Sequence, residues 1–153
     1  MTVLEQEQRF NGTCLCGEIK FQFDRSKIKT IYRCYCSLCR KQSGAASNTA
    51  TLISSEQFDW QQGGQFIQTY LKVTGFTSSF CRQCGSPVPN ALGSNAKIMW
   101  IPLGLIQQDF KPDAELNFCM NSKTSWAGEN EAHISFGELP NGIQLQHYFE
   151  LNE

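Results

Sequence analysis

The chain of 153 residues has a formal net charge of -1 and is 41% hydrophobic and 18% charged. This length favours one domain, residues 1–153, with a modest core. The near-neutral charge argues against a nucleic-acid partner, and no apolar segment approaches the roughly 18 residues that would span a bilayer. The first ten residues contain two glutamates and no apolar run, so we expect no signal peptide and a cytoplasmic protein.

Short segments with alternating apolar residues dominate the chain. The first, Glu18–Asp24, places Ile19, Phe21 and Phe23 on one face, which indicates a strand. Further strands are predicted over Ile28–Arg33, Thr49–Ile53, Phe66–Lys72, Phe76–Phe80, Ile98–Ile101, Leu116–Met120 and Ile143–Phe149.

Only two short helices are predicted. One lies around Leu38–Gln42, and the other begins at Ser54 or Ser55, either of which could cap a turn that continues through Phe58. Clusters of glycine, asparagine and serine separate the strands. This density of strands predicts a mainly β, antiparallel protein with a single domain.

Eight cysteines are the unusual feature of the composition. Seven of them fall in three tight clusters: Cys14/Cys16, Cys34/Cys36/Cys39 and Cys81/Cys84. In a secreted chain they would suggest disulfides, but without an export signal we expect reduced thiols that hold metal.

The two cysteine pairs predict one complete metal site. Structural zinc takes four thiolate or imidazole ligands in a tetrahedron, and a tight turn supplies two of them. Cys14 and Cys16 from one turn, with Cys81 and Cys84 from another, therefore make a tetrathiolate site. A glycine follows each pair, as expected for a knuckle turn that needs a positive φ.

Cys34, Cys36 and Cys39 then remain as a group of three. They are predicted to hold a second zinc whose fourth position is open, which is typical of a catalytic site. A different partition, which joins this group to one member of a pair, would leave an odd thiol and is disfavoured.

The remaining candidate ligands are single residues. Cys119 lies in the apolar run LNFCM, where a lone cysteine is most often a small buried apolar residue. Alternatively, Cys119, His133 or His147 completes the second site, which would make both zinc sites closed and structural.

Four motifs follow one another in the chain: GTCLCG at 12–17, CYCSLCRKQSG at 34–44, CRQCGS at 81–86 and SKTSW at 122–126. In this order they resemble the glutathione-dependent formaldehyde-activating (GFA) enzyme family, which also contains the centromere protein V type. The resemblance covers residues 10 to 140 approximately, and it implies a β-tent fold of packed antiparallel sheets stapled by zinc.

The resemblance also implies roles for the cysteines. Cys14, Cys16, Cys81 and Cys84 match the structural zinc site of the family, and Cys34, Cys36 and Cys39 match its catalytic zinc. The activity named for the family is that of a carbon–sulfur lyase, which joins formaldehyde to glutathione as S-hydroxymethylglutathione. The implied partners are therefore a small thiol and a small aldehyde.

Charged and aromatic residues near the second cluster are candidate substrate contacts. Arg33, Arg40 and Lys41 flank the three cysteines and could bind the carboxylates of a glutathione-like thiol, although solvated surface charge is the alternative. Trp100 and Trp126 could line a pocket or pack in the core.

One position departs from the family pattern. Tyr35 stands where members of the family often have histidine, and a phenol with a pKa of about 10 is no base near neutral pH. This departure slightly favours the alternative function, a zinc-stapled binding or scaffold module without turnover. The sequence implies no oligomeric state.

Overall fold

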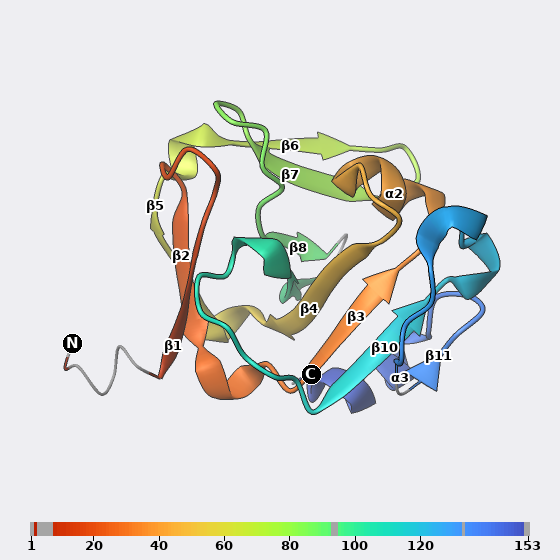
Figure 1. Ribbon diagram of the computed structural model, residues 1–153. Coiled ribbons are helices and arrows are strands. Elements are labelled where there is room, and N and C mark those ends of the chain that lie inside the picture. The colour runs from red at the N-terminus through yellow and green to blue at the C-terminus, as the bar shows by residue number, and fades with distance from the viewer. Residues whose placement is uncertain (1, 3–7, 93–94, 133, 152–153) are drawn as a thin grey trace.

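The structure is a computed structural model that describes residues 2, 8–92, 95–132 and 134–151, and these residues form three β-sheets (Figure 1). The first sheet is antiparallel and joins β1 (Arg9–Thr13), β2 (Lys20–Asp24) and β5 (Phe58–Gln62) in that order. The alternation in β2 buries Phe21 and Phe23, as the sequence predicts.

The second sheet is the largest. Its order is β11 (Ile134–Ser135), β10 (Ala114–Phe118), β3 (Thr30–Cys34), β4 (Asn48–Ser54), β9 (Asn95–Pro102) and β8 (Asn90–Leu92). Strand β10 runs parallel to both β3 and β11, and the other neighbours are antiparallel. The third sheet pairs β6 (Ile67–Leu71) with β7 (Thr77–Cys81), and it lies across the top of the molecule in Figure 1.

Two α-helices and six short 3₁₀ turns connect the strands in the described part of the chain. Helix α2 (Ser37–Ser43) follows β3 directly, and α3 (Gly142–Phe149) lies near the C-terminal end. The 3₁₀ turns are η1 (Arg25–Lys27), η2 (Ser55–Gln57), η3 (Gly64–Phe66), η4 (Leu103–Leu105), η5 (Met120–Ser122) and η6 (Ser125–Ala127). The helix predicted around 38–42 is confirmed, and the turn predicted at 54 or 55 is η2.

The strand predicted over Ile143–Phe149 is wrong, because these residues form α3. The alternation of apolar and polar residues imitates a strand, but the local hydrogen bonds favour a helix. The side chain of Asn141 accepts from the Gln144 N–H at 2.9 Å, and the Gln144 side chain accepts from the Asn141 N–H at 3.0 Å. This reciprocal capping box fixes the start of the helix.

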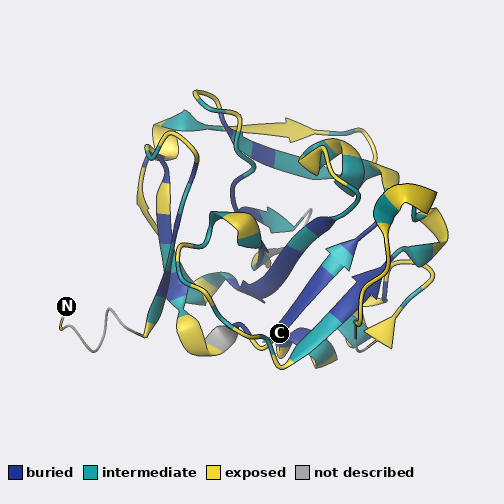
Figure 2. Ribbon diagram, viewed as in Figure 1, coloured by how far each residue is buried: buried dark blue, intermediate teal, exposed yellow. Residues whose placement is uncertain are grey.

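The buried residues concentrate on β3, β4 and β10, which run side by side in Figure 2. The ring of Tyr32 on β3 stacks on that of Phe118 on β10, with centroids 4.4 Å apart. A much smaller apolar cluster contains Ile19 and Val88 beside two cysteines, so this corner of the molecule has little apolar core of its own. In the described ranges, no helix is long and apolar enough to cross a bilayer.

Candidate metal centres

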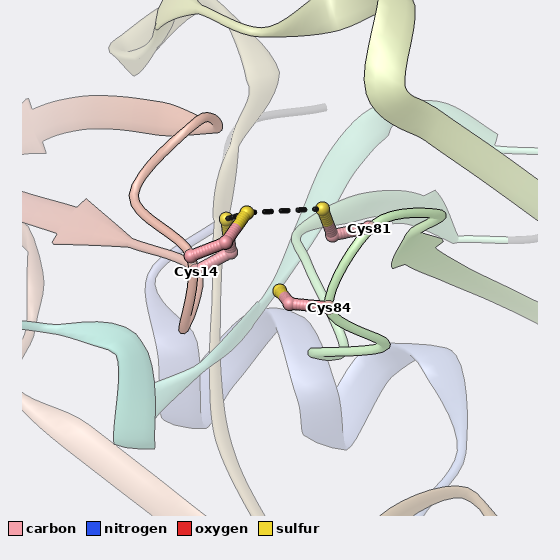
Figure 3. Close-up of side chains that lie close together, drawn as sticks. Cys14, Cys81 and Cys84 are labelled. Atoms are coloured by element: carbon pink, nitrogen blue, oxygen red, sulfur yellow. Dashed lines mark hydrogen bonds between the residues drawn. The ribbon is translucent and has the colours of Figure 1, made fainter.

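The first cysteine group joins the first sheet to the third. Cys14 and Cys16 lie in the turn between β1 and β2, while Cys81 ends β7 and Cys84 lies in the turn that follows. The four sulfur atoms all lie within 4.8 Å of one another. In Figure 3, the labelled side chains of Cys14, Cys81 and Cys84 point toward a common centre.

The sulfur–sulfur distances in this group fit a metal ion rather than disulfides. Cys16 Sγ lies 3.6 Å from Cys14 Sγ and 3.8 Å from Cys81 Sγ. A disulfide needs about 2 Å, and all eight cysteines are free thiols. A tetrahedron with zinc–sulfur bonds of about 2.3 Å has edges of about 3.8 Å. The group could therefore hold a metal ion, and these two distances are close to those of a zinc tetrahedron.

The turns of this group have the conformation that the sequence predicts. Gly17 and Gly85 have φ values of 84° and 79°, a region that disfavours residues with a side chain. Their N–H groups donate to the carbonyl oxygens of Cys14 at 3.1 Å and Cys81 at 2.7 Å. The Ile19 N–H also donates to Cys14 Sγ at 3.3 Å, which would stabilise a thiolate there.

The second group comes from one short segment. Cys34 ends β3, Cys36 is the N-cap of α2, and Cys39 lies in the first turn of that helix. Their sulfur atoms also lie within 4.8 Å of one another. The Cys39 N–H donates to Cys36 Sγ at 3.4 Å. Contacts with the thiols of Cys34 and Cys39 lower the pKa of Cys36 far below its usual value. Contacts with Cys36 and Cys39 raise that of Cys34.

Cys119 lies closer to this group than the sequence predicts. Its Sγ is 3.7 Å from Cys34 Sγ, and it is partly exposed rather than a buried apolar residue. A φ of 59° ends β10 one residue earlier and turns the chain into η5. Among the described residues, however, the set of mutually close sulfurs at this centre contains only Cys34, Cys36 and Cys39.

His147, the histidine that the structure describes, joins neither group. His147 is exposed on α3, where its ring contacts that of Tyr148. His133 lies outside the described residues.

A cavity of about 420 Å³ opens beside the second group. All three cysteines and Cys119 line it, and most of the remaining wall is apolar, including Tyr32, Leu52, Phe76, Leu92, Trp100 and Phe118. No charged side chain is among the described residues that form this wall. The sequence did not predict the cavity. Tyr32 could have been identified as a neighbour of the cysteines, since it lies two residues before Cys34 on the same face of β3.

The three cations that flank the cysteines lie outside the cavity wall. Arg33 alternates with Tyr32 and Cys34 along β3, and its guanidinium pairs with Glu115 at 3.0 Å. Arg40 is half-buried and Lys41 exposed on α2, and neither lines the cavity.

The two tryptophans have different surroundings. Trp100 on β9 is buried in the core and also lines the cavity, so both roles considered for it are present. Trp126 is 68% exposed, which contradicts core packing, and it does not line this cavity.

Tyr35 is a buried packing residue that does not line the cavity. Its hydroxyl accepts a hydrogen bond from Asn130 Nδ2 at 2.7 Å, and Lys123 Nζ lies 5.9 Å from the centre of its ring. Tyr35 therefore anchors the segment that includes the SKTSW motif.

These features define a mainly β protein with two cysteine groups that could each hold a metal ion, one of them beside a cavity. The family model described as glutathione-dependent formaldehyde-activating enzyme matches residues 9–121. The chain therefore belongs to the GFA family.

One curated relative and one solved structure illustrate the similarity. A protein of Halomonas elongata named "Putative glutathione-dependent formaldehyde-activating enzyme" is 30% identical over 80 residues, a match that spans 49% of this chain and about half, 51%, of that protein. A crystal structure of a Rhodobacter sphaeroides protein aligns with a TM-score of 0.53 and 23% identity over 65% of this chain and 90% of the other. The latter shows a shared fold.

Proposed function

We propose that the protein is a zinc-dependent carbon–sulfur lyase that adds a thiol, glutathione or a related compound, to formaldehyde or another small aldehyde. The observation that carries this proposal is the group of three sulfurs in the wall of a cavity. Membership of the GFA family supports it.

Zinc fits the donor set of both groups. Cys14, Cys16, Cys81 and Cys84 would hold a structural ion, and Cys34, Cys36 and Cys39 would hold a second ion beside the cavity. Zinc bound there would supply Lewis acidity, which lowers the pKa of an incoming thiol and so yields the nucleophilic thiolate at neutral pH.

The residues of the cavity would orient the reactants. The substrate sulfur forms a bond to the carbonyl carbon, the carbon–oxygen π bond opens, and the thiol proton ends on the oxygen as a hydroxyl group. Tyr32 is the phenol in the wall, and burial raises its pKa well above the usual value for tyrosine, so it stays protonated at neutral pH. Its hydroxyl could therefore donate a hydrogen bond to the aldehyde oxygen.

The charged part of a glutathione-like thiol would remain outside the apolar wall. Arg40 and Lys41 on α2 follow Cys39 directly and would attract its carboxylates there. Arg33 is less suited, because its guanidinium already pairs with Glu115.

A second function is favoured by the position of Cys119. Because its sulfur lies 3.7 Å from that of Cys34, a modest shift could complete a closed coordination sphere. The protein would then be a zinc-stapled scaffold without turnover.

The test compares zinc-loaded wild type with Cys36→Ser. Exchange NMR would measure how fast glutathione and formaldehyde form their adduct, relative to the spontaneous reaction. We expect at least tenfold acceleration by wild type and the spontaneous rate with Cys36→Ser, with both proteins folded by circular dichroism. If wild type accelerated the reaction of no thiol–aldehyde pair, the lyase proposal would be contradicted and the scaffold function would be the one that remains.

A further inference from the structure

We propose that the cavity beside Cys34, Cys36 and Cys39 binds an uncharged, apolar substituent of the substrate. The preferred adduct would then be a hemithioacetal with an apolar group on its sulfur side or on its carbonyl side. This inference rests on the proposed function and names the substrate class of the same site.

The composition of the wall is the first argument. Leu52, Trp100 and Phe118 are buried core residues that face this space, and Leu139 contributes at an exposed position. Aliphatic and aromatic walls gain free energy when they exchange water for another apolar surface. They offer little to a polar peptide backbone, which would lose hydrogen bonds to water.

The absence of charge in the described wall is the second argument. Glutathione carries two carboxylates and an ammonium group, and burying such groups without partners is costly. The nearby cations lie elsewhere, with Arg33 paired to Glu115 and Lys41 exposed on α2. The body of glutathione would therefore lie outside the cavity, which leaves the apolar space for another group.

The size of the cavity is the third argument. Its 420 Å³ lies in the range of about 300–1,000 Å³ that is usual for small-molecule sites. Formaldehyde has no substituent with which to fill it, whereas an apolar cavity of about 150 Å³ already holds benzene in another protein. A phenyl or alkyl group would fill the space, and each buried methylene should raise kcat/KM about fourfold.

The first arm of the test measures binding without reaction. Benzyl alcohol has the apolar group but neither a thiol nor a carbonyl, and its affinity for the zinc-loaded protein can be measured by NMR titration. Leu139→Asp places a charge in the wall at a residue that is 64% exposed, so the fold should persist. Leu71→Asp is the matched control, since Leu71 is 67% exposed on β6 and lies outside the wall.

We expect Leu139→Asp to weaken benzyl alcohol binding at least tenfold and Leu71→Asp to change it less than twofold. Equal effects of the two substitutions, or no saturable binding to wild type, would overturn the inference whatever the protein catalyses.

The second arm measures turnover and distinguishes the two sources of the apolar group. Benzyl mercaptan with formaldehyde places it on the thiol, and glutathione with phenylacetaldehyde places it on the aldehyde. We expect one of these pairs to exceed glutathione with formaldehyde at least tenfold in kcat/KM above the spontaneous reaction, and Leu139→Asp to remove that advantage.

The possible failures can be told apart. Turnover of glutathione with formaldehyde that neither apolar reactant improves would overturn the inference and leave the proposed lyase intact. No turnover of any pair would overturn the lyase and, with it, the assignment of the cavity to a substrate.

Discussion

The two cysteine groups use the same chemistry in different structural settings. The group of four draws on two turns whose cysteines, Cys16 and Cys81, lie 65 residues apart, and it joins the three-stranded sheet to β7. The group of three comes from the end of β3 and the first turn of α2, next to a cavity. One group therefore closes a long loop of the chain, while the other closes almost none.

This difference predicts which metal ion is needed for folding. A metal that bridges distant segments binds tightly only when they are folded together, so its binding free energy becomes folding free energy. The apolar cluster at the bridge is small, which increases the dependence on metal there. The group of three lies against the largest apolar cluster, which would persist without metal.

The largest expected effect is that of Cys84→Ser. Structural zinc in small domains contributes about 10–16 kcal/mol of apparent binding free energy, as much as most domains have in total stability. We expect this variant to be mostly unfolded at 25 °C, as measured by near-ultraviolet circular dichroism. Cys36→Ser is the matched control and should stay folded with one zinc fewer; equal unfolding of both variants would remove the distinction between the groups.

Cys119→Ser should have an intermediate effect and tests whether the second group really has three ligands. Because Cys119 lies outside the mutually close sulfurs at this centre, we expect two zinc ions per chain by elemental analysis and adduct formation within threefold of wild type. The loss of one zinc would identify Cys119 as a ligand and make the two groups alike.

The smallest expected effect is that of Tyr35→Phe. The substitution removes the hydrogen bond from Asn130 and keeps the buried ring, so we expect a loss of about 1 kcal/mol in the free energy of unfolding, measured with urea. Adduct formation should stay within twofold, since Tyr35 does not line the cavity. A tenfold loss of activity in the folded variant would instead place this tyrosine in the reaction.

Much of the β structure could be predicted from the sequence because β2, β3, β4, β6, β7, β9 and β10 lie in segments with local strand patterns. Strand β5 was missed, since most of its residues are exposed and show no apolar alternation. The 143–149 segment was assigned to the wrong class because alternation outweighed the Asn141–Gln144 capping signal. A local sequence pattern predicts the right element only where the burial and the hydrogen bonds of the segment favour the same structure as the pattern.

The cysteine partition could be read from spacing, since a pair in one turn needs a second pair to complete a tetrahedron. The cavity could not be predicted from spacing, because its wall combines residues that are far apart in the chain, such as Leu52, Trp100 and Leu139. The approach of Cys119 to Cys34 depends on the parallel pairing of β10 with β3 and on an unusual φ at a residue other than glycine. Neither has a local sequence signal.

The pairing of β10 with β3 joins segments that are far apart in the chain, which bears on assembly during translation. A ribosome that has released residues 1–84 has delivered every sulfur of the first group, while Phe118 and Leu139 of the cavity wall are still to be made. If this group binds a metal ion, we therefore expect the nascent chain to bind it early. The cavity beside the second group would form late, when β10 pairs with a β3 strand that has already been made.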